Sequence, residues 1–136
     1  MKQILILTML ACATCWAQTA DDSKPASSNV MGQQYPRIHP DLRGTFRLKA
    51  PDAKVVQVQV GADQKHYDLA KGADGVWMGT TPPMVPGFHY YYFFVDGVQM
   101  NDPASKAFYG VSKDSSGIEV PEAGVDFYGI KPVPHG

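Results

Sequence analysis

The feature that most constrains the fold of this chain is the run of residues 88–95, in which six of eight side chains are aromatic. At the two-residue period of a β-strand, the run divides into one face with His89, Tyr91, Phe93 and Val95 and a second face with Phe88, Tyr90, Tyr92 and Phe94. A strand in a two-layer sandwich needs only one apolar face. The second aromatic face must therefore be covered by a loop, another domain or a flat ligand such as a sugar ring.

Short alternating runs separated by turn residues surround this strand. Residues 45–49 and 55–60 alternate apolar and polar side chains, which predicts two half-buried neighbouring strands. Residues 65–69 form a weaker run, and 76–80 would return from it through a hairpin loop that contains Gly and Asp. With 11 Pro and 13 Gly, these runs predict an all-β fold, an immunoglobulin-like β-sandwich of about seven or eight antiparallel strands.

Length and charge limit the kinds of partner. A chain of 136 residues favours one domain. The 12 Lys and Arg residues are balanced by 13 Asp and Glu residues, so the formal net charge of −1 provides no overall basic field. Such a field is what attracts nucleic acid phosphates. We therefore expect no nucleic acid partner.

The N-terminus has the pattern of a secretory signal peptide over residues 1–17. Lys2 precedes an apolar stretch that is too short to span a bilayer as a helix, and Ala17 ends a cleavage pattern with small residues. Cleavage there removes both cysteines, Cys12 and Cys15, and predicts a secreted or periplasmic domain without disulfide or thiolate chemistry. A lipoprotein anchor on one of these cysteines is the less favoured alternative, because neither has the usual preceding residues.

Two segments follow the predicted cleavage point. Residues 18–34 are small and polar without apolar periodicity, which predicts a flexible leader. Residues 35–136 contain the β runs and form the predicted domain, with the edge of a linker at its C-terminal end.

Several motifs occur in a fixed order along the domain: 45–61, then Asp74-Gly-Val-Trp77, then 86–97 and Asn101-Asp-Pro103. In this order and spacing they resemble the family 48 carbohydrate-binding modules. The resemblance implies an immunoglobulin-like early-set sandwich placed before the catalytic domain of a glycan-active enzyme. The flanks, 35–40 and 116–136, are similar to the N-terminal module of secreted bacterial feruloyl and acetyl-xylan esterases, in which an α/β-hydrolase domain follows.

The chain departs from this family at three sugar contacts. Where starch-binding members have two Trp and a Lys, this sequence has residues 62–66, Gln99 and Tyr92. The loss of both Trp platforms argues against an α-glucan ligand. On the corresponding face we expect the ligand-binding residues to be Tyr90, Tyr92, Gln99 and Asn101, with Phe94, Gln57 and Gln59 nearby.

Two interpretations of this aromatic face remain open. It is either a stacking platform for a plant-wall polysaccharide such as xylan, or a packing surface for a catalytic domain or for the chain's own tail, residues 108–128. Packing is the favoured interpretation of the two. Trp77, Tyr91 and Phe93 are expected in the core, and His89 is expected to be a hydrogen-bonded structural histidine.

Catalysis is not expected on this chain. An α/β-hydrolase needs a Gly-x-Ser-x-Gly elbow, and the nearest string, around Gly110 and Ser112, lacks the closing Gly. The four His residues occupy unrelated contexts, so no metal site or cofactor is predicted.

The sequence thus predicts a non-catalytic accessory module of a secreted polysaccharide-degrading esterase system. It would position a catalytic esterase domain and contact plant-wall glycan. The alternatives are a purely structural protein-interaction domain, or a fragment of a longer esterase that is cut off at Gly136.

Overall fold

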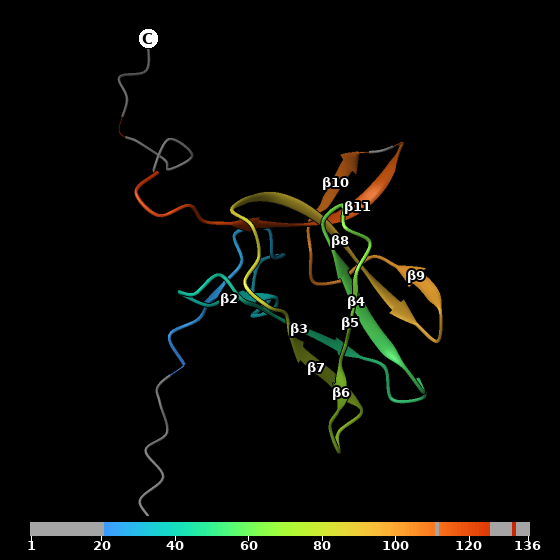
Figure 1. Ribbon diagram of the computed structural model, residues 1–136. Coiled ribbons are helices and arrows are strands. Elements are labelled where there is room, and N and C mark those ends of the chain that lie inside the picture. Colours follow the sequence, from blue (N-terminus) through green and yellow to red (C-terminus); the bar gives the residue numbers. More distant parts are fainter. Residues whose placement is uncertain (1–20, 111, 126–131, 133–136) are drawn as a thin grey trace, which may run out of the picture.

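The computed structural model describes residues 21–110, 112–125 and 132, and its secondary structure there consists of strands (Figure 1). Eleven strands are present in this part, and three of them have only two residues. The remaining eight agree with the number expected from the sequence. The strands are β1 (Lys24–Pro25), β2 (Arg37–Ile38), β3 (Gly44–Lys49), β4 (Val56–Val60), β5 (His66–Asp68), β6 (Ala70–Lys71), β7 (Val76–Thr80), β8 (Gly87–Val95), β9 (Val98–Met100), β10 (Ala107–Gly110) and β11 (Lys113–Val120).

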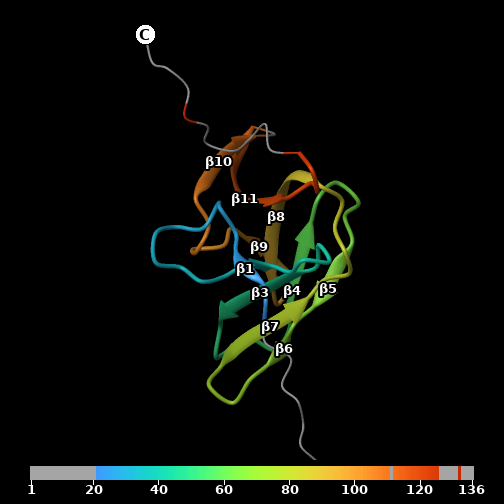
Figure 2. The same cartoon turned by 90° about the vertical axis from the view of Figure 1, so that its left-hand side faces the viewer.

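The strands form two antiparallel sheets. The five-stranded sheet has the order β1-β2-β3-β7-β6, and the six-stranded sheet has the order β10-β11-β8-β4-β5, with β9 paired to the end of β8. The β10–β11 hairpin lies at one end of the molecule and the β6–β7 hairpin at the other (Figure 2). Buried side chains from both sheets form one core, so the predicted all-β sandwich is confirmed.

The expected pairing of the first two long strands is wrong. β3 pairs with β7, Arg47 lying opposite Met78, whereas β4 pairs with β8, Gln57 lying opposite Phe94. The turn after β3, closed by a hydrogen bond from Ala53 N to the Ala50 carbonyl, precedes a strand in the other sheet. Apolar alternation predicts which face of a strand is buried, but it does not identify the neighbouring strand.

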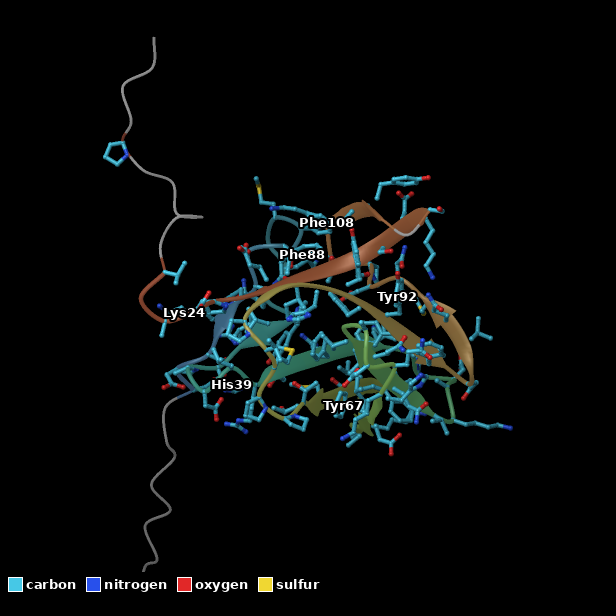
Figure 3. The ribbon with its side chains drawn as sticks, turned by 45° about the horizontal axis from the view of Figure 1, so that its top comes forward. Lys24, His39, Tyr67, Phe88, Tyr92 and Phe108 are labelled. Carbon is cyan, nitrogen blue, oxygen red and sulfur yellow. The ribbon has the colours of Figure 1, made fainter. Side chains whose placement is uncertain are left out.

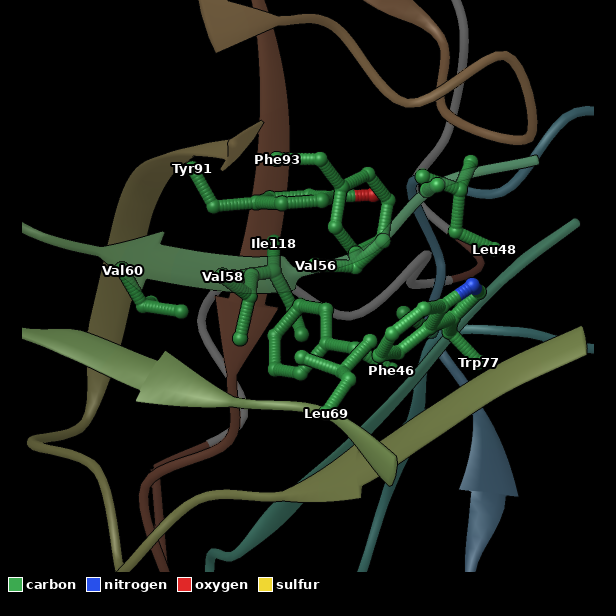
Figure 4. Close-up of a cluster of buried hydrophobic side chains, with 12 residues drawn as sticks. Phe46, Leu48, Val56, Val58, Val60, Leu69, Trp77, Tyr91, Phe93 and Ile118 are labelled. Atoms are coloured by element: carbon green, nitrogen blue, oxygen red, sulfur yellow. The ribbon is translucent and has the colours of Figure 1, made fainter. Parts of the chain in front are cut away.

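The core is filled by the inward faces that the alternation predicted (Figure 4). Phe46 meets the rings of Tyr91 and Phe93 in edge-to-face arrangements, with centroids 5.1 and 6.4 Å apart. Trp77 is buried beside them and donates its indole N–H to the Ala50 carbonyl. The expected core positions of Trp77, Tyr91 and Phe93 are therefore confirmed. The other buried apolar side chains of this cluster include Leu48, Val56, Val58, Val60, Leu69 and Ile118.

One buried polar pair connects β8 to the segment after β9. The Tyr91 hydroxyl donates to Asp102 Oδ2 at 2.7 Å, and the backbone N–H of Ala104 donates to Asp102 Oδ1 at the same distance. Burial raises the pKa of the Asp102 carboxyl above its usual range, although these two hydrogen bonds lower it. Burial likewise raises the pKa of Tyr91, which keeps its hydroxyl a donor. The Asp102 side chain thus caps the turn that begins at Asp102-Pro103, as the Asp-Pro pair in the sequence indicates.

The turn between β8 and β9 has the chemistry that Asp-Gly predicts. Asp96 and Gly97 have φ values of +47° and +85°, the left-handed backbone that a two-residue hairpin requires. The Asp96 carboxylate also accepts hydrogen bonds from the backbone N–H groups of Lys54 and Val55. This turn therefore closes the β8–β9 hairpin and also fixes the loop that leads into β4.

Residues 21–34 differ from the flexible leader expected for 18–34. β1 pairs with β2, Asn29 forms a β-bridge with Ser105, and the side chain of Ala26 is buried. Asn29 also donates from Nδ2 to the Pro36 carbonyl at 3.1 Å. The segment attaches through backbone pairing and short polar side chains, which leave no apolar periodicity to detect. The folded unit accordingly includes residues before the predicted boundary at 35.

Several predictions fall on residues outside the described part. The signal peptide over 1–17, the alternative anchor on Cys12 or Cys15 and the start of the leader all lie there, as does most of the tail after Val125. Among the residues that the structure does describe, no helix is long and apolar enough to cross a membrane.

Candidate functional site

The outer face of the six-stranded sheet carries side chains in rows that run across the strands. In one row, His66 of β5 lies opposite Gln59 of β4, and Gln59 lies opposite Tyr92 of β8. In the next row, Gln57 lies between Asp68 and Phe94, and Gln99 of β9 lies opposite Phe94 on its other side. Amide and aromatic side chains, all from rigid strands, therefore alternate across this face.

The first half of the β8 aromatic face packs in part against the chain itself, and Phe88 stays 46% exposed. Phe88 makes edge contacts with Tyr90 and with Phe108 of β10, at centroid distances of 5.3 and 5.0 Å. A Cβ added at Gly117 of β11 would lie 2.5 Å from the Phe88 ring and 2.7 Å from the Phe108 ring. Gly117 thus lets two rings lie directly on the strand. Figure 3 shows Phe108 and Phe88 close together on the same side of the sheet. We call Phe88, Tyr90, Phe108 and Gly117 the outer aromatic cluster.

The second half of this face is held by polar neighbours. The hydroxyl of Tyr92 lies 2.6 Å from the hydroxyl of Ser115, and Nζ of Lys113 lies 4.3 Å from the centroid of the Tyr92 ring. This is the distance of a cation–π contact. Both contacts fix the orientation of the Tyr92 ring on the sheet.

Phe94 is held by a chain of polar groups on the neighbouring strands. The His66 ring lies 4.2 Å from the Phe94 ring, and its Nδ1 is 3.3 Å from Gln57 Oε1. Gln57 in turn donates from Nε2 to the Asp68 carboxylate at 2.7 Å. These hydrogen bonds orient the Gln57 amide. Gln59, two residues along β4, lies on the same outer face.

An open groove of about 670 Å³ runs along this part of the face. It is lined by Tyr90, Tyr92 and Gln99 of the predicted set, together with the expected neighbours Gln59 and Phe94. Asn101, the fourth predicted residue, does not line it. Its side-chain amide instead donates to the backbone carbonyl of Asp114 at 3.1 Å, which ties the end of β9 to β11.

Two side chains that give the groove its charge and hydrogen-bonding character were not among the predicted site residues. Lys113 and His66 reach the groove from the outer strands β11 and β5. His66 falls in the stretch 62–66, where the resemblance has a sugar-contacting Trp, but it was not chosen as a ligand residue. The position of Lys113 depends on the pairing of β11 with β8, and no local motif marks it.

Other predicted features have structural explanations. His89 Nε2 lies 2.6 Å from the Val85 carbonyl oxygen, as expected for a structural histidine. Ser112, in the string nearest to a nucleophile elbow, lies with φ of +66° in the turn between two strands. A nucleophile elbow joins a strand to a helix.

One group of potential metal ligands lies on the opposite side of the fold. Ligand atoms of Asp21, Asp22 and His39 lie within 4.8 Å of one another. Asp21 accepts a hydrogen bond from the Ser23 backbone, and Ser23 is the main cause of its lowered pKa. His39 Nε2 lies 2.7 Å from the Thr45 hydroxyl. Hydrogen bonds within the chain therefore engage Asp21 and His39 of this cluster.

Comparison with known proteins finds a similarity to one part of a longer enzyme. No protein-family model matches it. It is 42% identical over 119 residues to an endo-1,4-beta-xylanase/feruloyl esterase of Xylanibacter ruminicola, a match that covers 85% of this chain. The chain spans 16% of the length of that relative. The similarity is therefore to a small part of a much larger enzyme.

Two pullulanases are among the solved structures that align with part of this chain. The type I pullulanase of Bacillus subtilis, complexed with maltose, aligns with a TM-score of 0.48 and 17% identity over 65% of this chain and 13% of its own. The apo pullulanase of Paenibacillus barengoltzii aligns with a TM-score of 0.45 and 20% identity over 74% of this chain and 14% of its own.

Proposed function

We propose that this chain is a non-catalytic accessory module of a secreted polysaccharide-degrading esterase system, similar to a family 48 carbohydrate-binding module, and that its outer face contacts plant-wall glycan. The groove over β4, β8 and β9 is the observation that carries this proposal. It combines the rings of Tyr92 and Phe94 with the amides of Gln59 and Gln99. Sugars are bound by this combination, in which C–H faces rest on rings and hydroxyls meet planar polar groups.

The size of the groove suits an oligosaccharide segment. Its volume falls within the range of roughly 300–1,000 Å³ that small-ligand sites occupy. Along β8, successive outward rings are two residues apart, which corresponds to about 6.7 Å. A polysaccharide chain can therefore lie along the strand and meet more than one ring. The similarity to a xylanase/feruloyl esterase supports xylan as the first polymer to test.

The packing interpretation applies to the first half of the same strand. Phe88 and Tyr90 lie in the outer aromatic cluster, where Phe108 and Gly117 cover part of their surface. Tyr90 therefore contributes to the edge of the groove, and Tyr92, Phe94 and Gln99 are the proposed main contacts. Asn101 would act by holding β9 in place.

A second groove supports the proposed contact with a catalytic domain. It lies where the N-terminal segment and the end of β11 meet, has a volume of about 590 Å³ and is largely apolar. Its lining includes Pro25, Ile38, Pro40, Pro121 and Val125. We propose that a catalytic domain, joined in cis as the length of the Xylanibacter ruminicola relative suggests, packs against this surface.

Affinity electrophoresis of the domain in gels containing xylan, arabinoxylan or starch tests the glycan proposal. The variant Gln59→Ala/Gln99→Ala removes two outward amides without touching the core, and Gln34→Ala is a matched exposed control. We expect retardation by xylan that the double variant loses and the control keeps. A folded wild-type domain that none of the three polymers retards would leave only the interaction module.

A further inference from the structure

The charged groups of the glycan groove are unevenly distributed. Among the described residues that line it, none is Asp or Glu, whereas Lys113 and His66 both belong to the lining. The remaining polar side chains include the neutral amides of Gln59, Gln64 and Gln99. A groove with a cation and no carboxylate favours a ligand that carries negative charge.

The carboxylates around the groove have other partners or directions. Asp63, between the lining residues Ala62 and Gln64, accepts a hydrogen bond from the backbone N–H of Lys65 at 3.1 Å. Asp68 lies one row away and accepts a hydrogen bond from Gln57. Asp114 follows Lys113 directly in β11, so strand alternation places its side chain on the other face. No salt bridge is recorded for Lys113 among the residues that the structure describes.

Lys113 also limits how a neutral sugar could bind. Its Nζ already lies over the Tyr92 ring, 4.3 Å from the centroid, and so occupies one face of that ring. A neutral sugar that stacks on this face of the ring must displace the ammonium. A sugar with a carboxylate can pair with the ammonium instead and leave the rest of the chain on Phe94 and the amides.

We propose that the groove selects an acidic glycan, in which the carboxylate of a uronic acid substituent pairs with Lys113 while the neutral backbone lies across Tyr92 and Phe94. This inference rests on the proposed glycan-binding function. It names the ligand class as a uronate-bearing polymer rather than the neutral polymer alone.

The direct test compares a glucuronoxylan with the same polymer after chemical reduction of its carboxyl groups to alcohols. Affinity electrophoresis at low salt should show wild-type binding to be tighter for the acidic polymer by about two- to fivefold, the range of a solvent-exposed ion pair. Added salt should reduce the difference. Free glucuronate serves as a competitor, and its failure to compete would show that the polymer backbone is needed as well.

Lys113→Met keeps an apolar side chain against Tyr92 and removes the charge. We expect this variant to bind both polymers equally, at the affinity that the wild type has for the reduced polymer. Lys49→Met, on β3 of the other sheet, is the matched control and should keep the preference. Equal binding of both polymers by the wild type would overturn the acidic selection and leave the proposed function standing. Absence of binding to either polymer would overturn both.

Discussion

The two faces of β8 are built from the same residue types and yet have different surroundings. On the inner face, Tyr91 and Phe93 are fully buried between the sheets. On the outer face, Tyr90, Tyr92 and Phe94 are partly exposed, and each touches a different neighbour. The comparison shows that an aromatic run alone does not define a binding platform. What covers each ring decides whether it stabilises the fold or remains available to a ligand.

The largest difference between the two faces should appear in stability. Phe93→Ala leaves a cavity in the core and should lower the free energy of unfolding by about 3–5 kcal/mol. Phe94→Ala, one residue away on the outer face, should cost about 1 kcal/mol or less. Urea denaturation followed by fluorescence measures both values. Similar losses for the two variants would mean that the outer face is part of the core.

Substitutions in the outer aromatic cluster should have an intermediate effect on the free energy of unfolding. Gly117→Ala places a methyl group against the Phe88 and Phe108 rings and should cost about 1–3 kcal/mol, as overpacking does. Combining it with Phe88→Ala should recover part of that loss, because the nearest ring is removed. A double-mutant cycle gives the coupling between the two sites. Strictly additive losses would contradict the packing of Phe88 on Gly117.

The buried carboxyl behind Tyr91 predicts a pH effect. Because burial raises the pKa of Asp102 in the folded state above its unfolded value, the folded protein binds the proton more tightly. The wild type should therefore lose stability as pH rises from the unfolded pKa through the folded one. Asp102→Asn should flatten this part of the profile. Thermal unfolding measured between acidic and neutral pH compares the two proteins, and parallel profiles would contradict the assignment.

The smallest effects on stability belong to the groove residues. Gln99→Ala and Lys113→Met remove exposed side chains and should change the free energy of unfolding by less than about 0.5 kcal/mol. Their thermal midpoints should match that of the wild type, while their glycan retention falls. A large loss of stability in either variant would assign it a structural role.

Local pattern was sufficient to predict the strands β3, β4, β5, β7 and β8 and their inward residues, because period-two alternation directly reports burial. It missed β10 and β11, which lie in the segment expected to be a tail. Val56, Val58 and Val60 are buried as their alternation predicts. Strand pairing was not predictable in the same way. β3 and β4 are adjacent in sequence but belong to different sheets. The turn between them could join strands of one sheet or of two, so the sequence pattern does not predict which strands pair.

The same limit explains what the sequence missed at the groove. Tyr92 and Gln99 follow from the strand around residue 92 and its hairpin, both of which are local. His66 and Lys113 reach the groove through pairing with strands at other positions in the chain. The docking of residues 21–34 was missed for a related reason. Ala26 donates its backbone N–H, and Asn29 its side-chain amide, to the Pro36 carbonyl, and these hydrogen bonds leave no apolar pattern in the sequence.

Chemical-shift mapping of the folded domain titrated with a xylo-oligosaccharide that carries a glucuronic acid branch tests the central claim most directly. The claim predicts that amide signals of β4, β8 and β9 near Gln59, Tyr92 and Gln99 move in a saturable way, while those of β3 and β7 stay in place. Shifts confined to the five-stranded sheet, or no shifts in a well-dispersed spectrum, would contradict it.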